Sequence, residues 1–169
     1  QLEKRLGLIK VQAPLFVKTS SGLQDQLSGK EKSVSFTKGD EEFEIVHSLA
    51  KWKREALGKY EFPLYKGLYT DMKAIRKDEE VDEVHSLYVE QWDWEKVIDK
   101  SDRTVDYLKD TVRSIYKAIR QTSIFIKQKY RFLSLDLPKS ITFITSQELE
   151  DIYKDKTPKE REDLITREH

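Results

Sequence analysis

Two short stretches of the sequence carry side chains that could bind a small charged molecule. Residues 67–76 alternate like a β-strand and end on Arg76, and residues 91–95 read QWDWE. The planar guanidinium of Arg76 could bind a phosphate or a carboxylate bidentately. On a strand, Gln91 and Asp93 would share one face, and the two tryptophans would share the other, where they could be buried. An acid, an amide and an arginine on neighbouring strands could therefore form a pocket floor that holds a zwitterion beside a phosphate.

Two other groups of residues could add to such a pocket. The loop 22–29 begins and ends on glycine, which allows close backbone approach to a ligand, and its Asp25 could bind an amine. Lys53 lies in a helical pattern and could meet an anion, although most helical lysines are solvated. We interpret His47 as a strand-end side chain rather than an acid or base. A surface turn, surface ion pairs and an aromatic core strand remain alternatives to a small-molecule site.

Composition limits the functional classes. The chain has 169 residues, and its 31 Lys and Arg balance its 31 Asp and Glu, which argues against a general nucleic-acid surface. It has no cysteine and three histidines, which argues against disulfides and zinc sites. No apolar run approaches the ~20 residues that span a bilayer, and no signal peptide is visible. We therefore expect a cytoplasmic protein that does not bind membranes.

Periodicity and turn residues predict a mixed architecture. The predicted helices are 1–6 ended by Gly7, 49–57 between Ser48 and Gly58, 105–130 capped by Ser101 or Asp102, 147–154 capped by Ser146, and one that starts near Pro158. The predicted strands are 8–17 interrupted at Pro14, 33–36, 42–46, 68–75, 85–94 and 140–145. This order predicts one α+β domain over residues 1–169 with a largely antiparallel sheet. Because residue 1 is not methionine and the last helix reaches the chain end, we expect a segment of a longer protein.

Several longer motifs resemble one enzyme family. They are VHSLAKWKR at 46–54, GLYT at 67–70, VEQWDWE at 89–95, QDQLSG at 24–29 and LGLIKVQAP at 6–14. Together they resemble the ammonia-dependent asparagine synthetases, the aspartate–ammonia ligases. The resemblance extends over residues 1–169 and covers about the N-terminal half of that enzyme.

The resemblance implies a fold like the catalytic core of class II aminoacyl-tRNA synthetases, of which this chain would be the N-terminal portion. Such a core has an antiparallel sheet flanked by helices and works as a homodimer. Residues 6–14 resemble the first motif of the class, which lies at the dimer interface. Arg76 resembles the arginine of the second motif, which binds the α-phosphate of ATP. The third motif and the later acidic residues of the family have no counterpart in this sequence.

The resemblance also implies a reaction. Mg-ATP adenylylates the side chain of L-aspartate, which gives a β-aspartyl adenylate and pyrophosphate. Ammonia then attacks the activated carbonyl and releases AMP and L-asparagine. ATP and Mg²⁺ are thus the implied cofactors, and aspartate, ammonia and ATP are the implied small-molecule partners, with no nucleic acid.

Residue roles follow from the same resemblance. The implied catalytic residues are Asp25, Arg76 and Gln91, and the implied substrate-binding residues are Asp25, Ser48, Lys53, Gln91 and Asp93. Arg76 is also the implied nucleotide-binding residue, and no metal ligand is expected in this segment. Asp25 and Asp93 would accept the substrate α-ammonium, Lys53 would bind a substrate carboxylate, and Gln91 would bond the acyl or phosphate oxygen. Asp25 or a neighbour would position or deprotonate the ammonia.

Two alternatives stay open at this point. One is an aspartyl- or asparaginyl-tRNA synthetase core, which shares the fold and the adenylate but needs a tRNA-binding domain. The other is a truncated, non-catalytic paralogue that uses the helix at 103–132 as a docking face. The absence of the third motif favours this second alternative, whereas the complete set of site residues argues against it.

Overall fold

The structure is a computed structural model that describes residues 1–27, 29, 31–134 and 136–168. Ser28 of the predicted ligand loop and His169 of the predicted last helix lie outside the described residues. The helices are α1 (Leu2–Leu6), α2 (Ala50–Lys59), α3 (Val105–Lys129), α4 (Ser146–Ile152) and α5 (Pro158–Glu168), with short 3-10 turns η1 (Thr19–Ser21) and η2 (Lys100–Asp102). The strands are β1 (Leu8–Lys10), β2 (Phe16–Lys18), β3 (Ser35–Lys38), β4 (Glu41–Ile45), β5 (Gly67–Ile75) and β6 (Tyr88–Lys96).

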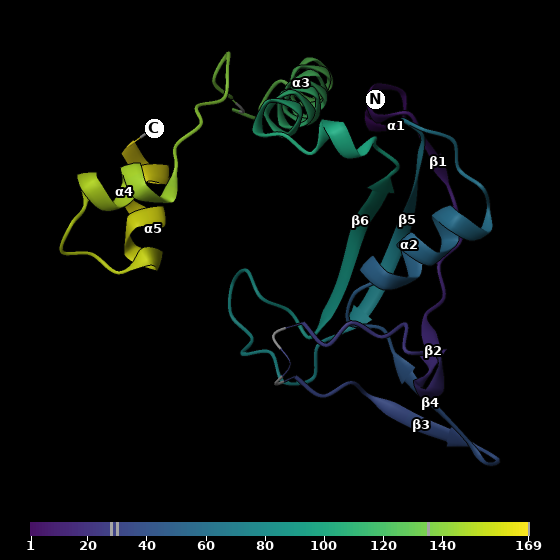
Figure 1. Ribbon diagram of the computed structural model, residues 1–169. Helices are drawn as coiled ribbons and strands as arrows, with labels where there is room; N and C mark the ends of the chain where they lie inside the picture. Colours follow the sequence, from purple (N-terminus) through teal and green to yellow (C-terminus); the bar gives the residue numbers. More distant parts are fainter. Residues whose placement is uncertain (28, 30, 135, 169) are drawn as a thin grey trace.

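The described strands form two three-stranded sheets, ordered β1-β5-β6 and β2-β4-β3 (Figure 1). Every pair is antiparallel except β1 with β5, which is parallel. A parallel pair needs a long crossover connection. Here the chain leaves β1, builds the second sheet and α2, and then returns as β5. The predicted mixed α+β class with largely antiparallel pairing is confirmed.

The β5–β6 hairpin supports the rest of the first sheet. Its register runs from Gly67 opposite Lys96 to Ile75 opposite Tyr88. A Cβ on Gly67 would lie only 2.2 Å from the carbonyl oxygen of Glu95. The close approach of the two backbones at this end of the hairpin therefore depends on glycine.

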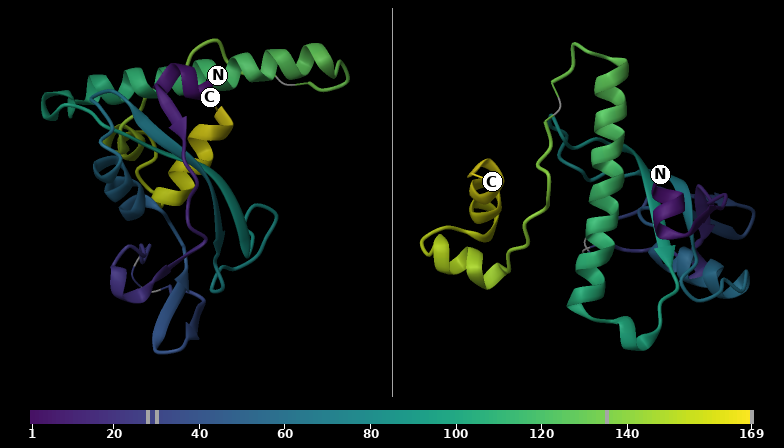
Figure 2. Two further views of the ribbon diagram at one scale, coloured as in Figure 1. Left: turned by 90° about the vertical axis from the view of Figure 1, so that its right-hand side faces the viewer. Right: turned by 90° about the horizontal axis from the view of Figure 1, so that it is seen from above.

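The two faces of this hairpin are covered differently. On one face, α2 packs with Leu57 against Leu68, and Leu49 packs with Met72 in a cluster that also holds Val46. On the opposite face lie α1 and α3, where buried Leu6, Leu8 and Tyr69 meet Trp94 and Ile115. Figure 2 shows α3 running along the side of the sheet away from α2. Each side chain of β6 therefore lies under α2 or under α3, and alternate residues lie on the same side.

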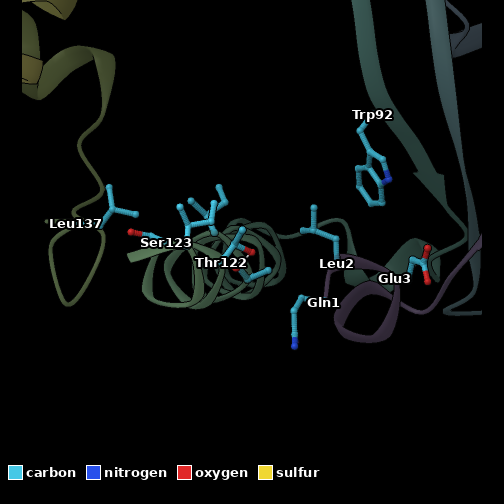
Figure 3. Close-up of a pocket in the computed structure, with 10 residues that line it drawn as sticks. Gln1, Leu2, Glu3, Trp92, Thr122, Ser123 and Leu137 are labelled. Carbon is cyan, nitrogen blue, oxygen red and sulfur yellow. Dashed lines mark hydrogen bonds between the residues drawn. The ribbon is translucent and has the colours of Figure 1, made fainter. Parts of the chain in front are cut away.

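A groove of about 650 Å³ lies on the α3 face, between α1, β6 and α3. Leu2, Trp92 and Ile119 contribute apolar surface to it, and Trp92 points into it from β6 (Figure 3). Of the candidate site residues, none lines this groove. This groove is therefore on the side of the sheet away from Gln91 and Asp93.

The helices α4 and α5 pack on one another, apart from the sheets (Figure 1). The Arg161 guanidinium joins them by an ion pair with Glu150 at 3.1 Å. The strand predicted at 140–145 is wrong, because this segment has no strand partner among the described residues. Its extended backbone instead follows α3, where the Tyr116 hydroxyl donates to the Pro138 carbonyl and Arg113 covers the Phe143 ring.

Several predicted helix ends are also corrected. Leu49 rather than Ser48 is the first residue outside α2, and Gly58 lies inside that helix, which continues to Lys59. The cap of α3 is Thr104, not Ser101 or Asp102. The cap of α4 is Thr145, not Ser146, in a reciprocal capping box with Glu148. For α3 and α4, several neighbouring polar residues could each cap the helix, so the sequence alone does not decide which one does. None of the described helices is both long and apolar enough to cross a membrane.

Two glycine substitutions test this packing. We expect Gly67→Ala to lower the free energy of unfolding by about 3 kcal/mol or more, because its Cβ would collide with backbone atoms of β6. We expect Gly58→Ala to raise it by about 0.5–1 kcal/mol, because nothing lies within 4 Å of the added methyl and alanine favours helix. Urea unfolding measures both. Destabilisation by Gly58→Ala would contradict the position of Gly58 inside α2.

Candidate functional site

The centre of the candidate site is a buried ion pair between α2 and β6. Lys53 is only 3% exposed, and its Nζ donates to Asp93 Oδ1 at 2.5 Å and to the Trp94 carbonyl at 3.3 Å. Glu95 Oε2 lies 3.8 Å from the same nitrogen. The solvated state that is common for helical lysines does not apply here, because α2 lies directly on the sheet. Lys53 and Asp93, which are far apart in sequence, are in direct contact.

The alternation of β6 explains this contact. Asp93 is paired with Thr70 and Gln91 with Met72, so both polar side chains lie on the α2 face. The predicted shared face is confirmed. On the opposite face, the Trp92 ring stacks on Tyr69 with centroids 4.7 Å apart, but Trp92 remains 36% exposed. The expected burial of the tryptophans is therefore only partial.

The loop before β3 places Asp25 at the start of α2. Asp25 Oδ2 accepts hydrogen bonds from Ser48 Oγ at 3.1 Å and from the Lys51 backbone N–H at 3.2 Å. Gln24 anchors the loop, because its amide donates to the Ile45 carbonyl at 2.8 Å and accepts from the His47 N–H at 3.1 Å. A carboxylate is stabilised at a helix N-terminus, where free backbone N–H groups point outward. The loop is thus fixed to the β4–α2 junction rather than being a plain surface turn.

Arg76 follows the last residue of β5. Its backbone N–H donates to the Leu87 carbonyl at 2.9 Å, which holds the hairpin closed beyond the strands. Its guanidinium lies 3.7 Å from Glu79, and its Nε is buried without a hydrogen-bond partner. Arg76 lines a cavity of about 100 Å³ together with His47 and Lys77. The arginine is therefore partly held by its own loop and partly available to a ligand.

The site residues form a row along the hairpin. Asp93 and Gln91 are two residues apart, which corresponds to about 7 Å on a strand. Arg76 lies beyond the end of β5, on the Gln91 side of the ion pair. The structure joins Lys53 to Asp93 and Asp25 to Ser48 directly, and it places Arg76 in a separate cavity. An ion pair, an amide and a guanidinium in this order could bind an extended molecule with a zwitterionic end and a phosphate.

Three residues of this region were not identified from the sequence as site residues. Thr70 is fully buried opposite Asp93, and its hydroxyl has no partner among the described residues. Glu95 adds a second carboxylate near Lys53. His47 is buried beside Arg76, although the sequence suggested only a strand-end side chain. Strand parity could have identified Thr70 and Glu95, whereas the burial of His47 depends on packing of distant residues.

Binding of a metal ion by protein ligands alone needs several ligand side chains in one place. Among residues 1–27, 29, 31–134 and 136–168, no cluster of three or more histidine or acidic side chains is arranged to hold one. In nucleotide sites Mg²⁺ is commonly held by one or two carboxylates together with phosphate oxygens, which does not need such a cluster.

A double-mutant cycle tests the ion pair. We expect a coupling energy of about 1–3 kcal/mol between Lys53→Met and Asp93→Asn in urea unfolding, because the pair is largely shielded from water. The exposed pair Lys10–Asp71 is the matched control, and we expect its coupling to stay below about 1 kcal/mol. Equal coupling in the two pairs would show that the Lys53 contact is no stronger than a surface pair.

Comparisons with known proteins identify the family of this chain. Residues 1–169 match the model of the family described as Aspartate-ammonia ligase. The aspartate–ammonia ligase of Clostridium tetani is 57% identical over 170 residues, which cover 99% of this chain and 50% of that protein. The corresponding protein of Bacillus cytotoxicus is 56% identical over 171 residues, covering 100% of this chain and 52% of that protein. That of Fusobacterium nucleatum is 55% identical over 169 residues, covering 99% and 52%. The chain spans about half the length of these curated relatives, and it belongs to the aspartate–ammonia ligase family.

Proposed function

We propose that a protein carrying this chain is an ATP-dependent ligase. It converts L-aspartate and ammonia to L-asparagine through a β-aspartyl adenylate and releases AMP and pyrophosphate. The observation that carries the proposal is the contact between Lys53 and Asp93 on the sheet floor. One cation and one anion side by side are the charge complement of the α-ammonium and α-carboxylate of an amino acid.

Recognition of aspartate would proceed by exchange of ion pairs. The substrate α-ammonium would bind Asp93, whose side chain is 25% exposed, and the α-carboxylate would bind Lys53. The Lys53–Asp93 pair would be replaced by two pairs with the substrate. Neither charge would be left buried and unpaired, which is the state that costs most. Lys53 and Asp93 would therefore neutralise each other before the substrate binds, and they would then provide one contact each for its two charged groups.

The first chemical step would take place between Gln91 and Arg76. A β-carboxylate oxygen of aspartate attacks the α-phosphorus of ATP, and the bond to pyrophosphate breaks. Arg76 would stabilise the negative charge on the α-phosphoryl oxygens, because a fixed guanidinium in a partly dry cavity acts strongly on a charged transition state. Gln91 lies between the ion pair and Arg76, so its amide N–H could donate to the acyl or phosphate oxygen.

The second step would use Asp25, at the start of α2. Ammonia attacks the activated carbonyl, the tetrahedral intermediate loses a proton, and AMP leaves. Asp25 would orient the ammonia and accept that proton, because a carboxylate held by Ser48 and the Lys51 N–H has a fixed direction. Ser48 would contribute by holding Asp25 and by contacting the substrate.

We also infer that these sheets belong to a class II aminoacyl-tRNA synthetase-like core. The antiparallel hairpin that ends in Arg76 and the helix–strand–proline order of α1, β1 and Pro14 support this fold. The core would form a homodimer through this first segment, since β1 is an edge strand and its Ile9 is 60% exposed. The cytoplasm would supply the aspartate, ammonia and ATP.

Removal of the Arg76 side chain tests the chemistry. In a full-length protein that carries this segment, we expect Arg76→Ala to reduce aspartate-dependent ATP–pyrophosphate exchange by at least about a thousandfold, because charge on the α-phosphoryl group would be unopposed. Arg131→Ala, at an exposed arginine beyond α3, is the control and should leave the exchange rate unchanged. Normal pyrophosphate release by Arg76→Ala would refute the assignment.

Substitution of Ile9 tests the proposed dimer. We expect Ile9→Asp in the full-length protein to shift the mass measured by light scattering from dimer towards monomer, because a charge would enter an apolar contact. Val84→Asp, at a side chain that is 84% exposed, should leave the mass unchanged. An unaltered dimer in Ile9→Asp would place the interface elsewhere.

A further inference from the structure

His47 is a buried polar side chain that the proposed mechanism leaves unused. It is 2% exposed, and neither ring nitrogen has a hydrogen-bond partner in the described part of the chain. A buried imidazole normally uses at least one nitrogen, because an unpaired polar atom away from water costs about 1–3 kcal/mol. The backbone N–H of His47 is fixed by the Gln24 side chain at 3.1 Å. The ring is therefore held in place by its backbone and not by its own polar atoms.

The ring borders the same cavity as Arg76. This cavity has a volume of about 100 Å³ and is lined by His47, Arg76 and several charged side chains. Arg76 Nε is also buried and unpartnered. Two nitrogen-bearing side chains with unused hydrogen-bonding atoms thus line one small, partly enclosed space.

The chemistry of these atoms selects the class of ligand. An arginine Nε can only donate a hydrogen bond, and a neutral imidazole always carries one N–H donor. A ligand that satisfies both must therefore present acceptor oxygens. Lys32 and Lys77 add positive charge at the cavity wall, and Glu31, Asp78 and Glu79 add negative charge, so the formal charges of the lining balance. Glu79, at 3.7 Å from the guanidinium, is the carboxylate that such a ligand would have to displace. The two unpartnered donors, and not the net charge, therefore favour an oxyanion over a cation or an apolar group.

We propose that His47 is a phosphoryl-binding residue of the adenylation step. One ring N–H donates to a phosphate oxygen of ATP while Arg76 Nε donates to another oxygen of the same chain of phosphates. This inference rests on the proposed ligase function. In addition to Arg76, His47 at the β4–α2 junction would be a second side chain that donates a hydrogen bond to the nucleotide. It would not contact aspartate.

Three substitutions at His47 separate a donor from a packing residue. In the full-length protein, we expect His47→Leu to lower kcat/KM for ATP by about ten- to a hundredfold in aspartate-dependent ATP–pyrophosphate exchange. The KM for aspartate should stay within about twofold, because the Lys53–Asp93 pair that would bind aspartate is unchanged. His47→Gln and His47→Asn keep an amide donor, and at least one of them should restore most of the lost kcat/KM. His85→Leu is the matched control, since His85 is exposed, bonds Asp82 and does not line the cavity.

The outcomes distinguish this inference from the function on which it rests. Absence of exchange in the wild-type protein would refute the ligase proposal itself. Normal kcat/KM for ATP in His47→Leu, with wild-type exchange intact, would overturn only the role of His47. Equal losses in the leucine, glutamine and asparagine variants, with matching drops in the unfolding midpoint, would show a packing role and would also overturn it. So would an equal loss in His85→Leu.

A measurement on the unmutated protein avoids any folding defect. In protein labelled with ring ¹⁵N-histidine, the His47 signals are those that disappear in a His47 variant. We expect inorganic pyrophosphate to shift these signals, because a new hydrogen bond to phosphate oxygen changes the shielding of the donor nitrogen. The His85 signals should not move. Unchanged His47 signals at saturating pyrophosphate would overturn the inference.

Discussion

The register of the β5–β6 hairpin is the constraint on which the rest of the structure depends. A slip by one residue would move Gln91 and Asp93 from the α2 face to the α3 face, because side chains alternate along a strand. The close fit at Gly67 fixes one end of this register, and the Arg76 N–H bond to Leu87 fixes the other. Both sheet faces and all β6 site residues are positioned by this one pairing.

The chemistry of the site follows from how each charge is paired in the absence of ligand. Lys53 is satisfied by Asp93, Asp25 is satisfied by Ser48 and a backbone N–H, and Arg76 is only partly satisfied by Glu79. A substrate zwitterion can replace the first pairing without leaving a bare charge. At the other end, the unused hydrogen-bonding atoms include two N–H donors, one on Arg76 and one on His47. The two ends of the row of site residues therefore differ: the Lys53–Asp93 end suits an amino acid, and the Arg76 end suits a phosphate.

The sequence predicted the parts of this arrangement that depend on local periodicity. The shared face of Gln91 and Asp93 follows from alternation, and the long helix α3 follows from apolar spacing. The burial of Lys53 could not be predicted in this way, because it depends on α2 lying across two strands that come later in the chain. The segment 140–145 shows a case in which the local pattern predicted an element that the structure does not form. Its β-branched residues favour a strand, but a strand also needs a neighbour, and sequence pattern does not supply one.

The parallel contact of β1 with β5 has a consequence for the order of folding. The β5–β6 hairpin joins segments that are close in sequence, so its turn can close rapidly. The pairing of Leu8 with Gly67 must instead close a loop that contains the second sheet and α2, and long loops lose more chain entropy on closure. We therefore expect the hairpin and its α2 cover to form first. The N-terminal strand, which carries the edge proposed to meet a second subunit, would then be among the last elements to find its place.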